Sequence, residues 1–149
     1  PQLYYGSEIG MAGDQNLGDA DIRRDFPGGW EYDENNAFYP ETRSEYHKAY
    51  FDFTAKLFQW RKNNEAVHTG KMTHYLPEDN IYVYFRYTDS KTVMVVVNNN
   101  ISSAIIQTTR FEENIKDFKK ANDVLSGKHF ELEKELEIEG QSVLVLELE

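Results

Sequence analysis

The sequence predicts a mainly β fold: an antiparallel β-sandwich that follows a short strand, a long loop and one helix. Three patterns indicate it. Apolar residues recur every three or four positions over residues 43–64, which is the period of one helix face. From residue 65 onward the apolar period becomes two, as in strands with one buried face. Turn-forming residues at 77–80 and 88–90 join these strands at hairpin spacing.

The N-terminal part of the chain predicts a strand followed by an irregular loop. Leu3, Tyr4 and Tyr5 form a short apolar run that ends at Gly6, and we interpret this run as a buried strand. Glycine and proline residues then recur as far as Pro40, so we expect no long regular element there. A structureless stretch of this length in a compact domain usually carries a function.

The segment from 43 to 64 is the one clear helix. Either Thr42 or Ser44 can cap its N-terminus, and Glu45 follows Thr42 at the spacing of a capping box. Two basic residues near its end suit the negative end of the helix dipole. Its expected apolar face consists of Tyr46, Ala49, Tyr50, Phe53, Leu57 and Trp60.

Alternating segments account for most of the chain after residue 68. Frequent strands joined by short turns are typical of an antiparallel sandwich or barrel. Carboxylates at alternate positions of 131–139 predict the solvated face of an edge strand rather than acid–base chemistry. The predicted strands cover residues 69–76, 81–87, 92–97, 104–108, 130–138 and 142–148, with a shorter strand and turn at 122–127.

The composition excludes several classes of partner and site. The chain carries a formal net charge of −10 and no basic stripe, so we expect it to bind neither nucleic acid nor an anionic membrane. It has no cysteine, which excludes disulfides, thiolate metal sites and a cysteine nucleophile. The compartment stays open, with a soluble periplasmic or secreted protein slightly favoured over a cytoplasmic one.

A metal site is not predicted in this chain. Residues 14–21 gather acidic and amide side chains in a loop, as calcium sites do. With Asp14 as the first ligand, however, Asp19 occupies the required glycine position and Asp25 the position of the closing glutamate. The four histidines are scattered and show no metal-binding spacing.

The N-terminal motifs resemble those of a known family. Residues 4–11 (YYGSEIGM), 19–23 (DADIR) and 26–30 (FPGGW) resemble the α-amylase family of glycoside hydrolases. In that family the first stretch forms the eighth strand of the (β/α)8 barrel, and an Asp-x-x-x-Arg element and a Trp follow in the next loop. Residues 57–70 are similar to the last barrel helix and its exit.

The later part of the chain agrees with this resemblance. Residues 82–86 and 93–98 are similar to the strands that open the family's C-terminal β-sandwich, and 142–148 to its last strand. The motifs are most similar to the cyclomaltodextrinase, neopullulanase and maltogenic-amylase branch. Residues 23–30 (RRDFPGGW) depart from the branch's more usual Arg-x-x-Met-x-Trp, so the linkage preference stays open.

The resemblance implies a C-terminal fragment of an enzyme, built of two parts. Residues 1–66 would be the remnant of a truncated (β/α)8 barrel, with its last strand, the substrate-side loop and the last helix. Residues 67–149 would form the C-terminal β-sandwich domain. The partner implied for the full-length enzyme is an α-glucan oligosaccharide, from starch, maltooligosaccharides, cyclodextrins or pullulan, and a transglycosylase of the same family stays open.

The catalytic machinery is expected outside this chain. Retaining glycosidases use two carboxylates about 5–5.5 Å apart, and the family's motifs for them do not occur in the 149 residues. The chain is therefore expected to hold no catalytic residue and to be inactive alone. Glu8 matches a glutamate that is not catalytic in the family, and we expect a structural role for it. No cofactor is implied, and a structural calcium ion in the full-length enzyme stays open.

Asp19, Arg23 and Trp30 are the predicted substrate-binding residues. Asp19 and Arg23 match the family's Asp-x-x-x-Arg element, whose side chains contact sugar hydroxyls; a carboxylate acceptor and a guanidinium donor can together bind a diol. The alternative is an ion pair that only holds the loop. Trp30 can stack on a sugar ring or cover the loop's own apolar surface.

Two other functions stay open. A stand-alone carbohydrate-binding module needs an exposed aromatic platform, for which Tyr75, Tyr82, Tyr84 and Tyr87 are the candidates. Alternation places Tyr82 and Tyr84 on one strand face and Tyr87 on the other, and one of these faces must be the core. Alternatively, the sandwich is a structural domain that supports the barrel or mediates a homodimer.

Overall fold

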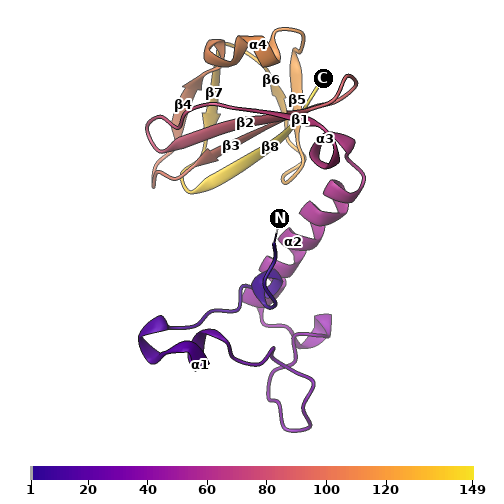
Figure 1. The fold of residues 1–149 in the computed structure, drawn as a ribbon, viewed down its shortest axis with the longest axis vertical. Coiled ribbons are helices and arrows are strands. Elements are labelled where there is room, and N and C mark those ends of the chain that lie inside the picture. Colours follow the sequence, from indigo (N-terminus) through magenta and orange to yellow (C-terminus); the bar gives the residue numbers. More distant parts are fainter. Residues whose placement is uncertain (1) are drawn as a thin grey trace. The chain divides into compact units, whose positions relative to one another are not determined.

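The computed structural model describes residues 2–149 and divides the chain into two compact units (Figure 1). One unit extends to Phe58, and the other is Gln59–Glu149. The boundary between them falls within helix α2 (Glu45–Lys62). The domain boundary expected between residues 66 and 67 stays a prediction.

The N-terminal unit consists of short helical turns joined by irregular segments. The expected buried strand at residues 2–5 is wrong, because this segment is not a strand and Leu3, Tyr4 and Tyr5 are 44–53% exposed. A strand depends on a neighbour for its backbone hydrogen bonds, and the described part of this unit contains no strand. Its elements before α2 are Ser7–Ile9, Gln15–Leu17, α1 (Asp19–Ile22) and Pro40–Thr42.

Helix α2 confirms the predicted helix, with ends two residues inside the expected ones. Ser44 is the cap, because its Oγ accepts a hydrogen bond of 3.1 Å from the His47 backbone N–H. A second, short helix, α3 (Glu65–His68), follows and was not predicted. Its cap is Asn64, whose Oδ1 accepts from the Ala66 N–H at 3.0 Å.

The second unit contains two antiparallel sheets, which confirms the mainly β prediction (Figure 1). Their strands lie close to the predicted ones, although a 3₁₀ turn (Thr108–Phe111) and a short helix, α4 (Glu112–Ile115), interrupt the series of strands. The larger sheet has the order β1 (Lys71–His74), β2 (Ile81–Tyr87), β3 (Thr92–Asn98), β8 (Ser142–Leu148), β5 (Lys120–Asp123) and β6 (His129–Glu131). The smaller sheet pairs β4 (Ala104–Gln107) with β7 (Glu135–Ile138).

The single strand expected at 130–138 is wrong, because β6 and β7 belong to different sheets. The chain leaves the first sheet at Leu132, whose N–H donates to the Lys119 carbonyl at 2.8 Å. It joins the second sheet at Lys134, whose carbonyl accepts from the Thr108 N–H at 2.9 Å. The carboxylates of Glu135 and Glu137 are exposed on β7, as the alternation predicted.

The larger sheet buries apolar side chains on both faces. Its inner face packs Phe85, Met94 and Leu146 against the smaller sheet and the α4 region. Its outer face packs Val93 and Val145 against α3. Because both faces carry buried residues, the strands read as nearly continuous apolar runs in the sequence.

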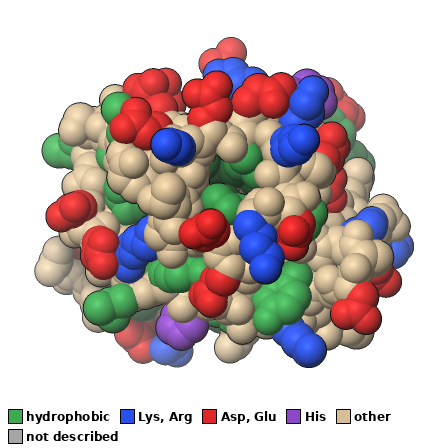
Figure 2. Space-filling model, turned by 90° about the horizontal axis from the view of Figure 1, so that it is seen from above, with side chains coloured by type: hydrophobic (Ala, Val, Ile, Leu, Met, Phe, Trp, Pro, Cys, Tyr) green, Lys and Arg blue, Asp and Glu red, His purple; other side chains and the backbone are tan. Residues whose placement is uncertain are grey.

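Charged groups are mixed on the surface. Figure 2 shows acidic side chains interspersed with basic ones, without an extended basic area on the face drawn. Such a face offers little attraction to a polyanion. Among the described residues, no helix combines the length and the apolar character that crossing a bilayer requires.

Candidate functional site

The motif at residues 6–11 forms a tight turn in which both glycines are needed. Gly6 and Gly10 have φ angles of 82° and 66°, and they flank the 3₁₀ turn Ser7–Ile9. The Met11 N–H closes the turn by donating to the Gly6 carbonyl at 2.8 Å. Ile9 is fully buried, and Glu8 is half-buried on the turn.

Helix α2 fixes this turn through two tyrosines. The Tyr46 hydroxyl donates to the Gly10 carbonyl at 3.1 Å. A Cβ atom at Gly10 would lie 2.7 Å from the Tyr50 ring, so the helix approaches the backbone as closely as a glycine permits. The two tyrosine rings themselves lie 4.8 Å apart. These contacts place the loop that follows Met11.

The loop from 14 to 24 is organised around Asp21. Its Oδ2 accepts from the Asp14 N–H at 2.6 Å, and its Oδ1 accepts from Arg24 Nε at 2.9 Å. The pKa of Asp21 is lowered, first by the hydrogen bond from the Asp14 backbone and then by those from Arg24. Asp14 also caps the turn Gln15–Leu17 by accepting from the Asn16 N–H.

Asp19 and Arg23 form an ion pair on the solvent side of the same loop. Arg23 Nη2 lies 3.2 Å from Asp19 Oδ2, and the two side chains are 62% and 74% exposed, respectively. An exposed pair of this kind contributes only about 0–1 kcal/mol to stability. The structure therefore brings the two predicted residues together and leaves both polar groups accessible.

Trp30 lies in a separate turn of the loop. Its backbone N–H donates to Asp33 Oδ2 at 3.0 Å, while its side chain is 70% exposed. Gly28 explains the preceding Phe-Pro-Gly-Gly sequence, because a Cβ there would come within 2.5 Å of Asn36 Oδ1. The Trp30 side chain is therefore accessible, and its substrate-binding role stays a prediction.

The tyrosines proposed as a sugar-binding platform do not share a surface. Tyr75 packs against Phe85 and Phe111 in the inner core, and its hydroxyl donates to Glu113 at 2.6 Å. Burial, and then this hydrogen bond, raise the pKa of Tyr75. Only Tyr82 and Tyr84 form a ring pair on the outer face, with centroids 5.5 Å apart. The four-residue platform is therefore wrong.

Metal ligands are not gathered anywhere in residues 2–149. No group of three or more histidine or acidic side chains lies close enough together to hold an ion. The acidic loop residues are instead occupied with backbone N–H groups and arginines, as the Asp14 and Asp21 contacts show.

A family model of the cyclo-malto-dextrinase C-terminal domain matches residues 72–147, just over half of the chain. The chain belongs to this family. The match covers β1 to β8 almost completely, and it confirms the relationship to the α-amylase family that the sequence motifs predicted.

Two curated relatives match longer stretches of this chain than the family model does. A cyclomaltodextrinase of Thermoanaerobacter pseudethanolicus is 29% identical over 130 residues, which cover 84% of this chain and 20% of that enzyme. Neopullulanase 2 of Thermoactinomyces vulgaris is 33% identical over 101 residues, covering 66% of this chain and 14% of that enzyme. The chain thus spans about a fifth or less of the length of these relatives.

A solved structure shows the same fold. The α-amylase of Geobacillus thermoleovorans, crystallised in complex with acarbose, matches 98% of this chain and 29% of its own with a TM-score of 0.69. The identity is 19%, so this likeness concerns the fold.

Sequence reasoning missed the residue that organises the loop. Asp21 and Arg24 are three positions apart, and this spacing is as readable as the four-residue spacing of Asp19 and Arg23. The signal available in the sequence was the presence of two possible acid–arginine ion pairs within residues 19–24, either of which could hold the loop. The Asp14 N–H decides between them, because it is the backbone donor that Asp21 alone reaches.

Proposed function

We propose that the chain forms the C-terminal part of a retaining glycoside hydrolase acting on α-glucans. In this proposal the sandwich is a structural domain, and the loop that contains α1 supplies part of the sugar-binding surface. Asp19 and Arg23 bind sugar hydroxyls, and Trp30 packs against a sugar ring. Support comes from the family membership and from the names of the relatives, a cyclomaltodextrinase and a neopullulanase.

The observation that carries the proposal is that the loop contains two ion pairs, Asp21–Arg24 and Asp19–Arg23, in different surroundings. The Asp21–Arg24 pair and the Asp14 backbone hold the loop. Asp19 and Arg23 take no part in these contacts, and they present an acceptor and a forked donor to solvent. This is the arrangement that binding a neutral diol requires.

The chain alone is proposed to lack the catalytic carboxylates. We expect the purified 149-residue chain to release no reducing sugar from cyclodextrin or maltotriose. Clear turnover by a preparation free of other glycosidases would contradict this part of the proposal.

The binding role is tested in the full-length protein that contains this chain. We expect Asp19→Ala to raise the KM for maltotriose about tenfold, the loss of one charge-assisted hydrogen bond, with a smaller change in kcat. Asp25→Ala is the matched control, because Asp25 is an exposed carboxylate of the same loop that takes no part in the Asp19–Arg23 ion pair. Unchanged kinetics for Asp19→Ala would refute the role.

A double-mutant cycle of Asp19 and Arg23 distinguishes a role in binding sugar from a role in holding the loop in place. If Asp19 and Arg23 only hold each other, each single alanine variant and the double variant lose the same amount. If both bind sugar, the double variant loses more than either single variant. We expect the second result, with the circular dichroism of all three variants unchanged.

A further inference from the structure

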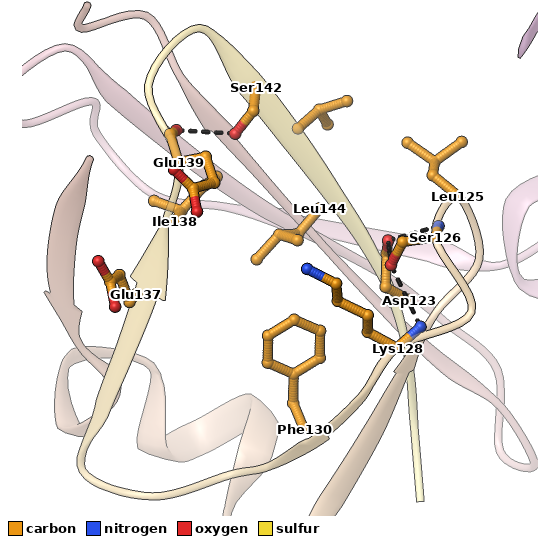
Figure 3. A pocket seen from close by; sticks show the side chains of 11 residues that line it. Asp123, Leu125, Ser126, Lys128, Phe130, Glu137, Ile138, Glu139, Ser142 and Leu144 are labelled. Atoms are coloured by element: carbon orange, nitrogen blue, oxygen red, sulfur yellow. Dashed lines mark hydrogen bonds between the residues drawn. The ribbon is translucent and has the colours of Figure 1, made fainter. Parts of the chain in front are cut away.

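The sandwich unit contains a cavity that neither the loop nor the proposed function uses. It lies between the β5–β6 turn, β7 and the beginning of β8, and its volume is about 490 Å³ (Figure 3). This volume falls within the range of about 300–1,000 Å³ that is usual for small-molecule sites. β6 pairs only with β5 and β7 only with β4 among the described strands, so the cavity opens where both sheets end.

The floor of the cavity is part of the folded core. Ile138 is almost fully buried, and Phe130 and Leu144 are half-buried and pack against the inner core cluster. Figure 3 shows the Phe130 ring and the Leu144 side chain directed into the space between the strands. The apolar floor is therefore formed before any ligand arrives.

On one side of the cavity, the buried Asp123 fixes the turn between β5 and β6. Asp123 accepts from the Ser126 N–H at 2.8 Å, from the Ser126 hydroxyl at 2.6 Å and from the Val145 N–H at 3.0 Å. Burial raises the pKa of this carboxyl, but the hydrogen bonds from Ser126 and Val145 outweigh it and lower the pKa overall. The Lys128 carbonyl, which accepts from the Asp123 N–H at 2.8 Å, is held by the same turn.

On the other side of the cavity, the buried Asn98 fixes the turn between β7 and β8. Asn98 Nδ2 donates to the Glu139 carbonyl at 2.9 Å and to the Ser102 carbonyl at 3.1 Å. The Ser142 hydroxyl donates to the same Glu139 carbonyl at 2.7 Å. Both walls are thus fixed by buried polar groups, which reduces the conformational cost of binding.

Three charged side chains at the rim of the cavity are not engaged by the protein itself. Within residues 2–149, the Lys128 ammonium and the carboxylates of Glu137 and Glu139 have no recorded hydrogen bond or ion pair, and all three residues are exposed. In Figure 3 the two glutamates lie across the cavity from Lys128. A ligand must therefore donate hydrogen bonds on one side, accept them on the other, and present an apolar face to Phe130.

Neutral polyhydroxylated rings meet all three requirements. Each hydroxyl both donates and accepts, and the C–H face of a pyranose can cover an aromatic ring, as apolar faces do. An anion would face two carboxylates against one ammonium, and a purely apolar ligand would make no polar contact with any of the three charged side chains. We propose that this cavity binds a glucose unit of an α-glucan chain; the choice of glucan rests on the proposed function.

The test is a titration of the 149-residue chain with maltotriose, followed by amide and methyl NMR shifts. We expect saturable shifts at Lys128, Phe130, Ser142 and Leu144. Lys128→Ala and Glu137→Gln should each weaken the affinity about fivefold to tenfold, since each removes a charge-assisted hydrogen bond. Neither residue is part of the core, so the variants should fold. Lys119→Ala, at an exposed lysine that does not line the cavity, should leave the affinity unchanged.

Two results would overturn the proposal. One is a folded chain whose cavity signals do not move with maltotriose at tens of millimolar, or move equally in Lys128→Ala. The other is a set of cavity shifts that follow protein concentration, which would mean that a second copy of the chain fills the space. Either failure leaves the Asp19→Ala kinetics untouched, and loss of the Asp19 effect leaves the cavity titration untouched, so the two proposals fail separately.

Discussion

Trp60 Nε1 donates a hydrogen bond of 2.8 Å to Glu147 Oε1, across 87 positions of sequence. Asn64 Nδ2 donates to the same oxygen, also at 2.8 Å. Trp60 lies near the end of α2, Asn64 caps α3, and Glu147 lies on β8. One carboxylate therefore connects the helical segment at the start of the second unit to the centre of its larger sheet.

Replacing Glu147 by alanine should destabilise the sandwich unit. Two donors lose a charged acceptor in a half-buried position, and we expect the free energy of unfolding to fall by about 2 kcal/mol. Urea unfolding, followed by tryptophan fluorescence and by circular dichroism, measures the change. Glu149→Ala is the control, because the Glu149 backbone makes its hydrogen bonds and its side chain is exposed; it should stay within about 0.5 kcal/mol of the original chain. Equal effects of both substitutions would contradict the assigned role.

The sequence predicted those helices and strands whose buried faces show up as a regular spacing of apolar residues. The apolar period over α2 and the period of two over β2, β3 and β8 follow from burial of one or both faces, which sequence records directly. Residues 2–5 have equally strong strand composition, but composition does not supply a neighbouring strand. α3 has four residues, too few for a helical period, and only its Asn64 cap could have indicated it.

The candidate site was predictable to the level of residue pairs. The spacing of Asp19 and Arg23 allowed an ion pair, and the structure contains it. Whether that pair or Asp21 with Arg24 holds the loop depends on the Asp14 N–H, a backbone group whose direction the sequence does not reveal. The cavity in the sandwich was not predictable, because its lining residues come from four separate strands, β5 to β8, and from the turns that follow β5 and β7.

Replacing Gly140 or Gly127 of the sandwich by alanine should lower the stability by very different amounts. A Cβ at Gly140 would collide with the Ile101 backbone, where the Gln141 N–H donates to the Asn100 carbonyl at 2.7 Å. Gly127 has a φ of 75° but no atom within 4 Å of its Cβ position. We expect Gly140→Ala to cost about 3 kcal/mol through backbone displacement, and Gly127→Ala about 1 kcal/mol through backbone strain alone. Thermal unfolding of both variants would reveal a reversed order if this assignment is mistaken.

Asp123 should give the sandwich unit an acid-sensitive contribution to stability. Its pKa in the folded chain lies below the ordinary value of 3.8, because the hydrogen bonds from Ser126 and Val145 outweigh the opposing effect of burial. Between these two pKa values the unfolded chain binds the proton and the folded chain does not, so stability rises with pH. The contribution is therefore complete above the ordinary value and is lost as the pH falls through the folded pKa.

Asp123→Asn removes this contribution and places an amide against the Ser126 donors. Near pH 6 we expect the variant to be less stable by about 1–3 kcal/mol, and the difference should shrink as the pH is lowered through 3.8. Ser126→Ala is the matched variant, since it keeps the carboxylate but removes the hydroxyl donor 2.6 Å away. Its folded pKa for Asp123 should rise toward 3.8, so the acid-induced loss of stability should be smaller and should end at a higher pH than in the original chain. Urea unfolding between pH 6 and pH 2.5 measures all three curves, and curves for Asp123→Asn and the original chain that stay parallel would show that the carboxylate has no such role.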